Sequence, residues 1–227
     1  MDAGFRSYNL EPLLQALKRF GFAPAHIIDV GANKGDWTRN AIKFFPDAHY
    51  TLMEPQDNLK THIEDLIEAG HKIRWINAGA GDKSGSRPFT ISPHDDRSTF
   101  TLSKEEAAAE GLRQVIMEVK TLNDVVSMGI EPVPDMVKID AEGLDLRVLE
   151  GGSELFGKTD VFVLEAAVCA RFENTVAKAM KRLSDAGYKL IDITDLNRSP
   201  KHGVLWLCEL VFLREASPLL DAASSYD

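Results

Sequence analysis

Apolar residues along the chain follow two different spacings. Short runs rich in apolar residues lie at positions 27–30, 49–53 and 72–77, as in strands that are buried on both faces of a sheet. Between these runs, apolar residues recur every three or four positions, which is the spacing of one helix face. This order of elements, with short connections, predicts right-handed parallel crossovers and a doubly wound α/β sheet. The two helical stripes contain Trp37, Ala41, Phe44 and Phe45, and then Leu59, Ile63, Leu66 and Ile67.

The same alternation returns in the second half of the chain. We expect strands at residues 136–140 and 161–165, each followed by a helix with one apolar face. The last two strands, at 188–193 and 204–213, are separated by a polar loop that contains proline, so an antiparallel hairpin is expected. The pattern predicts a single domain, 1–227, built on a mostly parallel sheet of seven strands with helices on both faces.

Three segments lie outside this rhythm. Apolar residues at helical spacing before Gly21 predict a helical extension over residues 1–25, and the small, polar tail at 218–227 is expected to be frayed. Residues 78–134 form a long excursion between two sheet strands, which is typical of a functional segment. We expect it to form a roof over the site and to supply most substrate contacts. Within it, a strand at 88–91, an extended run at 115–119 and a helix at 122–127 are expected.

A glycine-bearing turn joins the first strand to its helix. Gly31 and Gly35 have no Cβ, so the backbone there can approach a ligand closely. Asn33 between them tolerates left-handed dihedral angles better than other residues that carry a side chain. Backbone N–H groups of such a turn, together with the helix N-terminus, face a bound cofactor. The spacing G-x-N-x-G differs from G-x-G-x-x-G, which disfavours a dinucleotide.

Polar residues also end the other strands on this edge. Glu54 follows the second strand at the position where an acidic residue accepts hydrogen bonds from both ribose hydroxyls of an adenosine cofactor. Asn77 and Asp140 end two further strands. Ligands of open parallel sheets bind beyond the carboxyl ends of the strands, so we expect these side chains around one cofactor.

Carboxylates are dense near residue 140. Asp140 and Glu142 belong to one turn, and Glu165 ends the adjacent strand. Crowded carboxylates raise one another's pKa and are suited to act as a general base toward a hydroxyl. All-oxygen ligands equally suit Mg²⁺ or Ca²⁺, and this alternative stays open although a metal is not favoured. Because no two histidines have metal-ligand spacing, zinc is not expected.

Lys138 is unusual because it falls in a strand that should be buried on both faces. An ammonium group there is costly unless a carboxylate pairs with it. Lys138 lies two residues before Asp140 and hence on the same face, and the expected partners are Asp29 and Glu165. The sequence therefore predicts a buried ion pair beneath the glycine turn.

Several further side chains are weaker candidates. His94, in the roof, is a candidate proton relay, and Arg97, Ser98 and Thr99 are candidates for hydrogen bonds to a polar substrate. Cys169 and Cys208 are interpreted as small core residues.

Composition narrows the class of protein. The net charge of −9 disfavours a nucleic-acid partner, since phosphate binding needs a basic face. Two cysteines are too few for a disulfide framework, which favours a cytoplasmic location. No apolar run approaches the roughly 18 residues of a membrane span, and no signal peptide is evident, so no membrane partner is expected. A small-molecule substrate is the expected partner.

With these motifs, the sequence resembles the FkbM family of S-adenosylmethionine-dependent methyltransferases. The resemblance runs from about Ile27 to Phe212, and it is specific because several motifs occur together in order. The matching stretches are residues 28–35, Glu54-Pro55, Asn77-Ala78 with the following Gly-Asp turn, residues 121–124, residues 137–143 and residues 148–151.

The resemblance implies a Rossmann-like methyltransferase sheet, S-adenosyl-L-methionine as methyl donor, S-adenosyl-L-homocysteine as product, and O-methylation of a sugar or another small polar metabolite. It places Glu54 at the ribose diol, Asn77 and Ala78 at the adenine edge, and Asp140 at the reacting end. The base is expected to be Asp140 or Glu142, with Glu165 and His94 as further candidates. The implied cofactor set is Asp29, Gly31, Asn33, Gly35, Trp37, Glu54, Pro55, Asn77, Ala78 and Asp140.

Three alternatives are weighed against this reading. A nicotinamide-dependent oxidoreductase would need the wider glycine spacing and a catalytic Tyr/Lys or His pair, which are not found. A divalent-metal-dependent O-methyltransferase and a non-catalytic module that binds S-adenosylmethionine remain compatible with the sequence.

Overall fold

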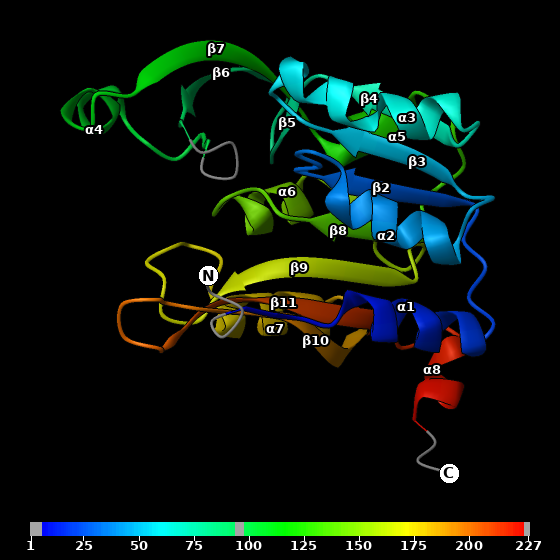
Figure 1. Cartoon of the computed structure of the whole chain (residues 1–227). Helices are drawn as coiled ribbons and strands as arrows, with labels where there is room; N and C mark the ends of the chain where they lie inside the picture. Colours follow the sequence, from blue (N-terminus) through cyan, green and yellow to red (C-terminus); the bar gives the residue numbers. More distant parts are fainter. Residues whose placement is uncertain (1–5, 94–97, 225–227) are drawn as a thin grey trace.

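The structure is a computed structural model that describes residues 6–93 and 98–224. Its main sheet has eight strands in the order β1-β10-β11-β9-β8-β2-β3-β4 (Figure 1). The strands are β1 (Arg6–Tyr8), β2 (His26–Val30), β3 (His49–Met53), β4 (Lys72–Ile76), β8 (Met136–Ile139), β9 (Val161–Ala167), β10 (Tyr188–Arg198) and β11 (Leu205–Arg214).

The pairing of the strands confirms the predicted sheet. Strands β2, β3, β4, β8 and β9 pair in parallel, and β11 pairs antiparallel with both β9 and β10. Strand β2 lies between β3 and β8, so the chain winds outward in opposite directions from this point. In such sheets the ligand crevice lies at the carboxyl ends of the strands where the winding direction changes. The fold therefore places the crevice at the glycine turn after β2 and the acidic turn after β8.

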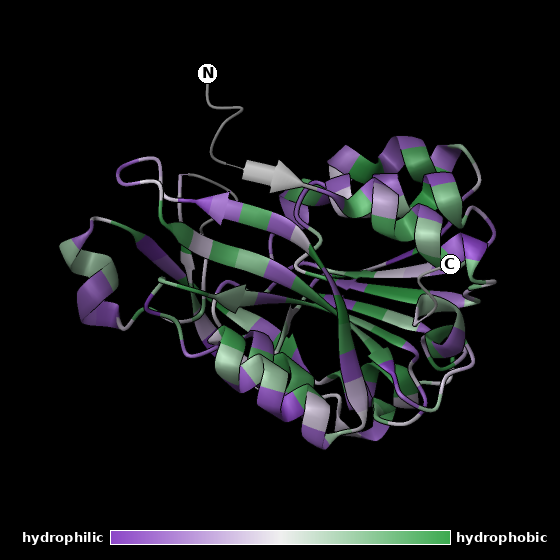
Figure 2. Ribbon diagram, turned by 90° about the horizontal axis from the view of Figure 1, so that it is seen from below, coloured by the Kyte–Doolittle hydropathy of each residue, from purple (hydrophilic) through white to green (hydrophobic). Residues whose placement is uncertain are grey.

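Helices cover both faces of the main sheet. Helices α1 (Leu10–Arg19) and α2 (Asp36–Phe44) pack on one face. Helices α5 (Leu122–Ser127), α6 (Asp145–Glu150) and α7 (Val176–Asp185) pack on the other. Figure 2 shows the hydrophobic residues concentrated on the central strands, between polar helix surfaces. Two apolar cores, one on each face, thus fix the strand ends that carry the site.

The excursion builds a second, smaller sheet. Its strands are β5 (Gly79–Ala80), β6 (Gly85–Ile91) and β7 (Arg113–Lys120), in the order β5-β7-β6. The strands expected at 88–91 and 115–119 are confirmed and are longer than predicted. Helix α4 (Lys104–Ala109) lies between β6 and β7 and was not predicted; its start is fixed by a Ser103 capping box. The arm formed by β6, β7 and α4 lies on the carboxyl side of the main sheet (Figure 1).

Four details differ from the prediction. Within the segment predicted as a helical extension, residues 6–8 form β1, which pairs with β10 and is too short to leave a periodic pattern. The helix expected across Leu59 to Ile67 is broken into η1 (Asp57–Ile63) and α3 (Glu64–Glu68), because Ile63 leaves helical dihedral angles.

The other two corrections concern the tail and a cysteine. The tail is not frayed over its whole length, because Leu219–Ala223 form α8 and Leu219 is buried against the core. Cys208 is buried as expected, whereas Cys169 is exposed in the loop after β9. Among the described residues, none of the helices has the length and apolar character needed to cross a membrane.

Candidate functional site

The turn after β2 is held by backbone hydrogen bonds. Gly31 N–H and Ala32 N–H both donate to the Met53 carbonyl oxygen, at 2.9 and 3.2 Å. Gly31, Asn33 and Gly35 all have positive φ, with Asn33 at 48°, as the choice of residues predicted. The turn therefore has a fixed shape that side chains larger than glycine would disturb.

Glu54 fastens this turn to the end of β3. Its Oε2 accepts from Asn33 N–H at 3.0 Å, and its Oε1 accepts from Gln56 N–H at 2.9 Å. The carboxylate is 4% exposed, and burial raises its pKa although these hydrogen bonds oppose the rise. Oε1 also accepts from Gln56 Nε2 at 3.4 Å, whereas Oε2 keeps acceptor capacity for a hydroxyl group.

The acidic turn after β8 lies directly against the glycine turn. A Cβ on Gly31 would come within 1.9 Å of the Asp140 carbonyl oxygen, so the two turns touch through their backbones. Glu142 has a φ of 49°, which is rare for a residue with a side chain. Such strain persists where the surroundings enforce it and is frequent at functional sites.

Lys138 joins the two turns from below. Its Nζ lies 3.2 Å from Asp29 Oδ1 and 3.5 Å from Asp140 Oδ2, and it donates to the Val30 and Gly31 carbonyl oxygens. Burial lowers the pKa of Lys138, but Asp29, Asp140 and Glu209 outweigh burial and raise it overall. The predicted buried pair with Asp29 is confirmed, and Asp140 takes the place expected for Glu165.

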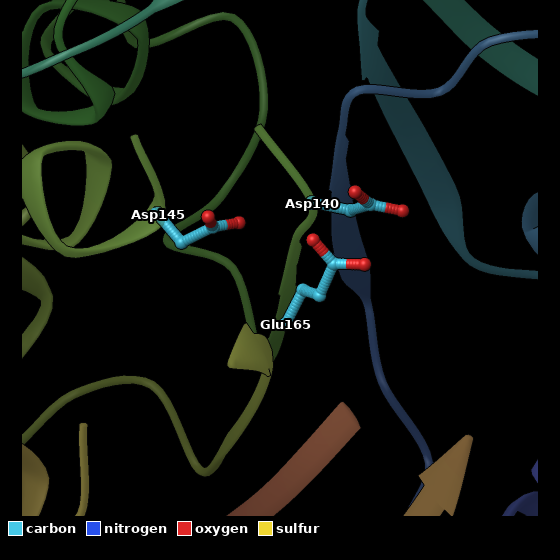
Figure 3. Close-up of side chains that lie close together, drawn as sticks. All are labelled: Asp140, Asp145 and Glu165. Atoms are coloured by element: carbon cyan, nitrogen blue, oxygen red, sulfur yellow. The ribbon is translucent and has the colours of Figure 1, made fainter. Parts of the chain in front are cut away.

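Asp140, Asp145 and Glu165 converge from three separate elements (Figure 3). Each offers a carboxylate oxygen, and these oxygens lie within 4.8 Å of one another. Asp145 accepts from Ala141 N–H, Gly143 N–H and Asn174 Nδ2, whereas Glu165 Oε2 is buried without a hydrogen-bond partner. Burial and then repulsion by Asp140 raise the pKa of both Asp145 and Glu165.

A cleft opens between the two turns and the roof. Together with space open to solvent it measures about 680 Å³. Phe89, Phe100 and Leu144 give it apolar walls. Its polar lining includes Asn33, Glu54, Gln56, Ser98, Thr99, Asp140 and Glu142, and its small residues include Gly31, Gly79 and Ala80.

A second cavity adjoins this cleft at the acidic turn. Thr99, Asp140 and Glu142 line both spaces. From there the second cavity passes Glu165 and reaches the loop between β10 and β11. Asp140 and Glu142 therefore lie at the junction of the two cavities.

Two roof residues contact the loops that follow β3 and β8. Ser98 Oγ donates to Gln56 Oε1 at 3.2 Å, and Thr99 Oγ1 donates to the Glu142 carbonyl oxygen at 3.3 Å. Both residues line the first cleft. The candidates His94 and Arg97 lie outside the described residues.

Five predicted cofactor residues do not line the cleft. Asp29 and Trp37 are buried beneath it, Asp29 bound to Lys138 and to the Thr38 hydroxyl, and Trp37 packed in the core. Gly35 lies where a Cβ would strike Ile63. Asn77 donates to the Glu54 and Pro55 carbonyl oxygens. Ala78 is fully buried. These residues shape the site from behind, while Gly31, Asn33, Glu54, Pro55 and Asp140 line it.

Sequence reasoning missed three parts of the site. Gln56 has a readable signal, since it follows Glu54-Pro55 directly. Asp145 has one as well, because it opens α6 just after the acidic turn. The β10–β11 loop has no such signal, since its approach to the site depends on how the strands of the sheet pair.

Comparison with known proteins agrees with this class of fold. The 1,6-didemethyltoxoflavin-N1-methyltransferase of Burkholderia thailandensis, solved with S-adenosylhomocysteine, superposes with a TM-score of 0.51 at 12% identity, covering 90% of this chain and 76% of that one. A putative O-methyltransferase from Klebsiella pneumoniae gives 0.51 at 12% identity, covering 91% and 80%. At this identity the likeness establishes a shared Rossmann-like methyltransferase fold.

The sequence itself gives the family. The profile described as "Methyltransferase FkbM domain" matches residues 29–190, so the chain belongs to the FkbM methyltransferase family. Methyltransferase sdnD of Sordaria araneosa is 27% identical over 158 residues, which cover 56% of this chain and 60% of that protein. Hexuronic acid methyltransferase AglP of Haloferax volcanii is 27% identical over 173 residues, which cover 75% and 65%. The chain thus spans under two thirds of the length of these relatives.

Proposed function

We propose that this protein is an S-adenosylmethionine-dependent O-methyltransferase that acts on a hydroxyl group of a small polar metabolite, such as a sugar. The observation that carries the proposal is the junction of two cavities at Asp140 and Glu142, with Glu54 and Gly31 in the first cavity. Membership of the FkbM family supports it, as does the relative named a hexuronic acid methyltransferase.

The residues of the first cleft fit the cofactor. Gly31 leaves space that a side chain would fill, and Glu54 presents a buried carboxylate suited to a ribose diol. The cofactor would supply an electrophilic methyl group on a positively charged sulfur. The carboxylates of Glu54, Asp140 and Glu142 in the lining of the cleft would stabilise that charge.

The chain's own residues would then orient the acceptor. Methyl transfer to oxygen is an in-line displacement, so holding the hydroxyl near the donor contributes several kcal/mol. We assign Asp140 or Glu142 as the base that accepts the hydroxyl proton, because both reach the two cavities. Glu165 lines only the second cavity and does not reach the first cleft, so it is the less favoured base.

An Asp140→Asn variant tests this assignment together with the enzymatic reading. We expect it to retain binding of S-adenosylhomocysteine within about tenfold and to lose methyl transfer by about 100-fold or more. Binding would be measured by calorimetry, and turnover with labelled donor and a small-molecule extract of the source organism. Unchanged turnover would remove Asp140 as the base, and binding without turnover in the wild type would favour a non-catalytic module.

A divalent-metal-dependent O-methyltransferase is the second candidate. The convergence of Asp140, Asp145 and Glu165 favours it, because carboxylate oxygens are the preferred ligands of Mg²⁺. Exhaustive chelation separates the candidates. Activity that survives chelation supports the metal-independent enzyme, and activity restored only by Mg²⁺ or Mn²⁺ supports the second.

A further inference from the structure

The far end of the second cavity differs in charge from the end near Asp140. Its lining there includes Arg198, Lys201 and His202, all on the β10–β11 hairpin. The near end is lined by Asp140, Glu142 and Glu165. A single cavity therefore runs from carboxylates at the methyl-transfer junction to cationic side chains at the hairpin.

The hairpin loop has a defined shape. Ser199 N–H donates to the Val204 carbonyl oxygen at 2.9 Å, and Gly203 N–H donates to the Ser199 carbonyl oxygen at 2.8 Å. Gly203 supplies the positive φ, 71°, that the turn needs. The Arg198 guanidinium donates to the Gly203 carbonyl oxygen at 3.2 Å, which holds its side chain against the loop. The cations are thus presented on an ordered loop.

Within the described ranges, no carboxylate forms a salt bridge with Arg198 or Lys201. Some basic residues elsewhere do have such partners, as Arg182 has Glu150 and Arg214 has Asp160. Two unpaired cations that line one cavity are notable in a chain with a net charge of −9. Cations placed in this way attract an anionic group and reject acceptors of the opposite charge.

Two aromatic side chains also line this cavity. Phe172 and Trp206 line the cavity, and the Trp206 ring lies 6.3 Å from the His202 ring, centre to centre. Trp206 is 37% exposed, which is high for so large an apolar side chain. Its exposed ring is suited to pack against the apolar face of a sugar ring.

From this arrangement we propose that the acceptor is an anionic sugar, whose carboxylate or phosphate is bound by Arg198 and Lys201 while its hydroxyl lies at Asp140 and Glu142. The inference rests on the proposed function and adds the substrate class and two specificity residues. The carboxylates at the near end repel the anionic group, so the acceptor enters in one orientation.

The test measures dissociation constants by calorimetry, with the protein saturated with S-adenosylhomocysteine. The probes are D-glucuronic acid, glucose 6-phosphate and glucose, which separate carboxylate from phosphate and both from a neutral sugar. We expect at least one anionic sugar to bind about tenfold or more tightly than glucose, as for the loss of one charge-assisted contact.

The double variant Arg198→Gln/Lys201→Gln is expected to abolish this preference, so that the anionic sugars and glucose bind about equally. Both side chains are exposed, so the fold should be retained, which the melting temperature checks. Lys158→Gln is the matched control. Lys158 is exposed and precedes β9, so it lies at the amino end of the strand, away from the cavity at the carboxyl end. The control should keep the wild-type preference.

Three outcomes overturn the inference: equal binding of anionic and neutral sugars, binding of none of the three, or a preference that survives in the double variant. Failure of S-adenosylhomocysteine to bind contradicts the proposed function instead. The sugar titrations repeated without it then decide the inference separately.

Discussion

The two cavities that meet at Asp140 are built in different ways. The cofactor cleft is shaped by backbone, with Gly31 N–H bound to the Met53 carbonyl oxygen and Glu54 bound to two N–H groups. The second cavity, proposed to hold the acceptor, is lined largely by side chains on or next to loops, among them Thr99, Arg198 and Lys201. Backbone geometry restricts which residues are tolerated, whereas loop side chains can change without disturbing the fold. Under the proposed function, the cleft would determine the cofactor, and the loops would determine the acceptor.

Lys138 gives the largest expected effect on the cleft. Lys138→Met would leave the carboxylates of Asp29 and Asp140 without their buried cation. Removing one partner of a buried pair costs about 3–5 kcal/mol, which chemical denaturation would measure as a loss of unfolding free energy. Lys43→Met is the control, because Lys43 pairs with Glu11 at an exposed site, and it should cost under about 1 kcal/mol. Equal effects of the two variants would show that Lys138 does not hold the turns together.

Gly31→Ala tests the backbone contact between the turns. The added Cβ would meet the Asp140 carbonyl oxygen, and the alanine would also have to adopt a φ of 69°. We expect a loss of about 3 kcal/mol in stability and at least tenfold weaker binding of S-adenosylhomocysteine. Gly21→Ala has a similar φ, 88°, with no atom within 4 Å of the new Cβ, so it isolates the dihedral cost of about 1 kcal/mol. If the backbone contact between the turns matters, Gly31→Ala must lower the stability clearly more than Gly21→Ala does.

Glu209 gives a pH-dependent effect beneath the junction. Burial raises its pKa from 4.5 to about 7, partly opposed by Lys138. The native state then binds more protons than the unfolded state between these values, so the stability contributed by Glu209 falls as pH rises from about 5 to 7. Glu209→Gln should flatten the fall by about 2 kcal/mol over this range, measured by denaturation at several pH values. An unchanged slope would contradict the raised pKa.

Glu54→Gln gives the smallest change among these variants. An amide NH₂ would face one of the N–H donors of Asn33 and Gln56, and the ribose diol would lose a charged acceptor. We expect S-adenosylhomocysteine to bind about tenfold more weakly by calorimetry. The exposed Glu64→Gln on α3 should leave affinity unchanged. A stronger effect on sugar binding than on cofactor binding would contradict the assignment of Glu54 to the cofactor.

The difference between the two cavities also explains what could be predicted. Gly31, Asn33 and the Lys138–Asp29 pair were readable, because positive φ and a buried charge each require particular residue types. The positions of Trp37 in the core and of Asn77 against the Pro55 carbonyl oxygen were not readable, since motif position does not tell whether a side chain lines the cleft.

The residues that line the second cavity were harder to predict from the sequence. The excursion was predicted as a roof, and Ser98 and Thr99 do line the cleft, but the β10–β11 hairpin was not expected to contribute. Arg198 and Lys201 lie in an ordinary polar loop by sequence. They reach the site because β11 pairs beside β9, and that long-range pairing cannot be read from local patterns.

Thermal unfolding of the wild-type protein with S-adenosylhomocysteine or with NAD tests the cofactor assignment most directly. A ligand at about 100 times its dissociation constant stabilises the protein by about 2.7 kcal/mol. For a chain of this size that predicts a rise in melting temperature of about 5–10 °C with S-adenosylhomocysteine and none with NAD. Stabilisation by NAD alone, or by neither compound, would contradict a cleft built for S-adenosylmethionine.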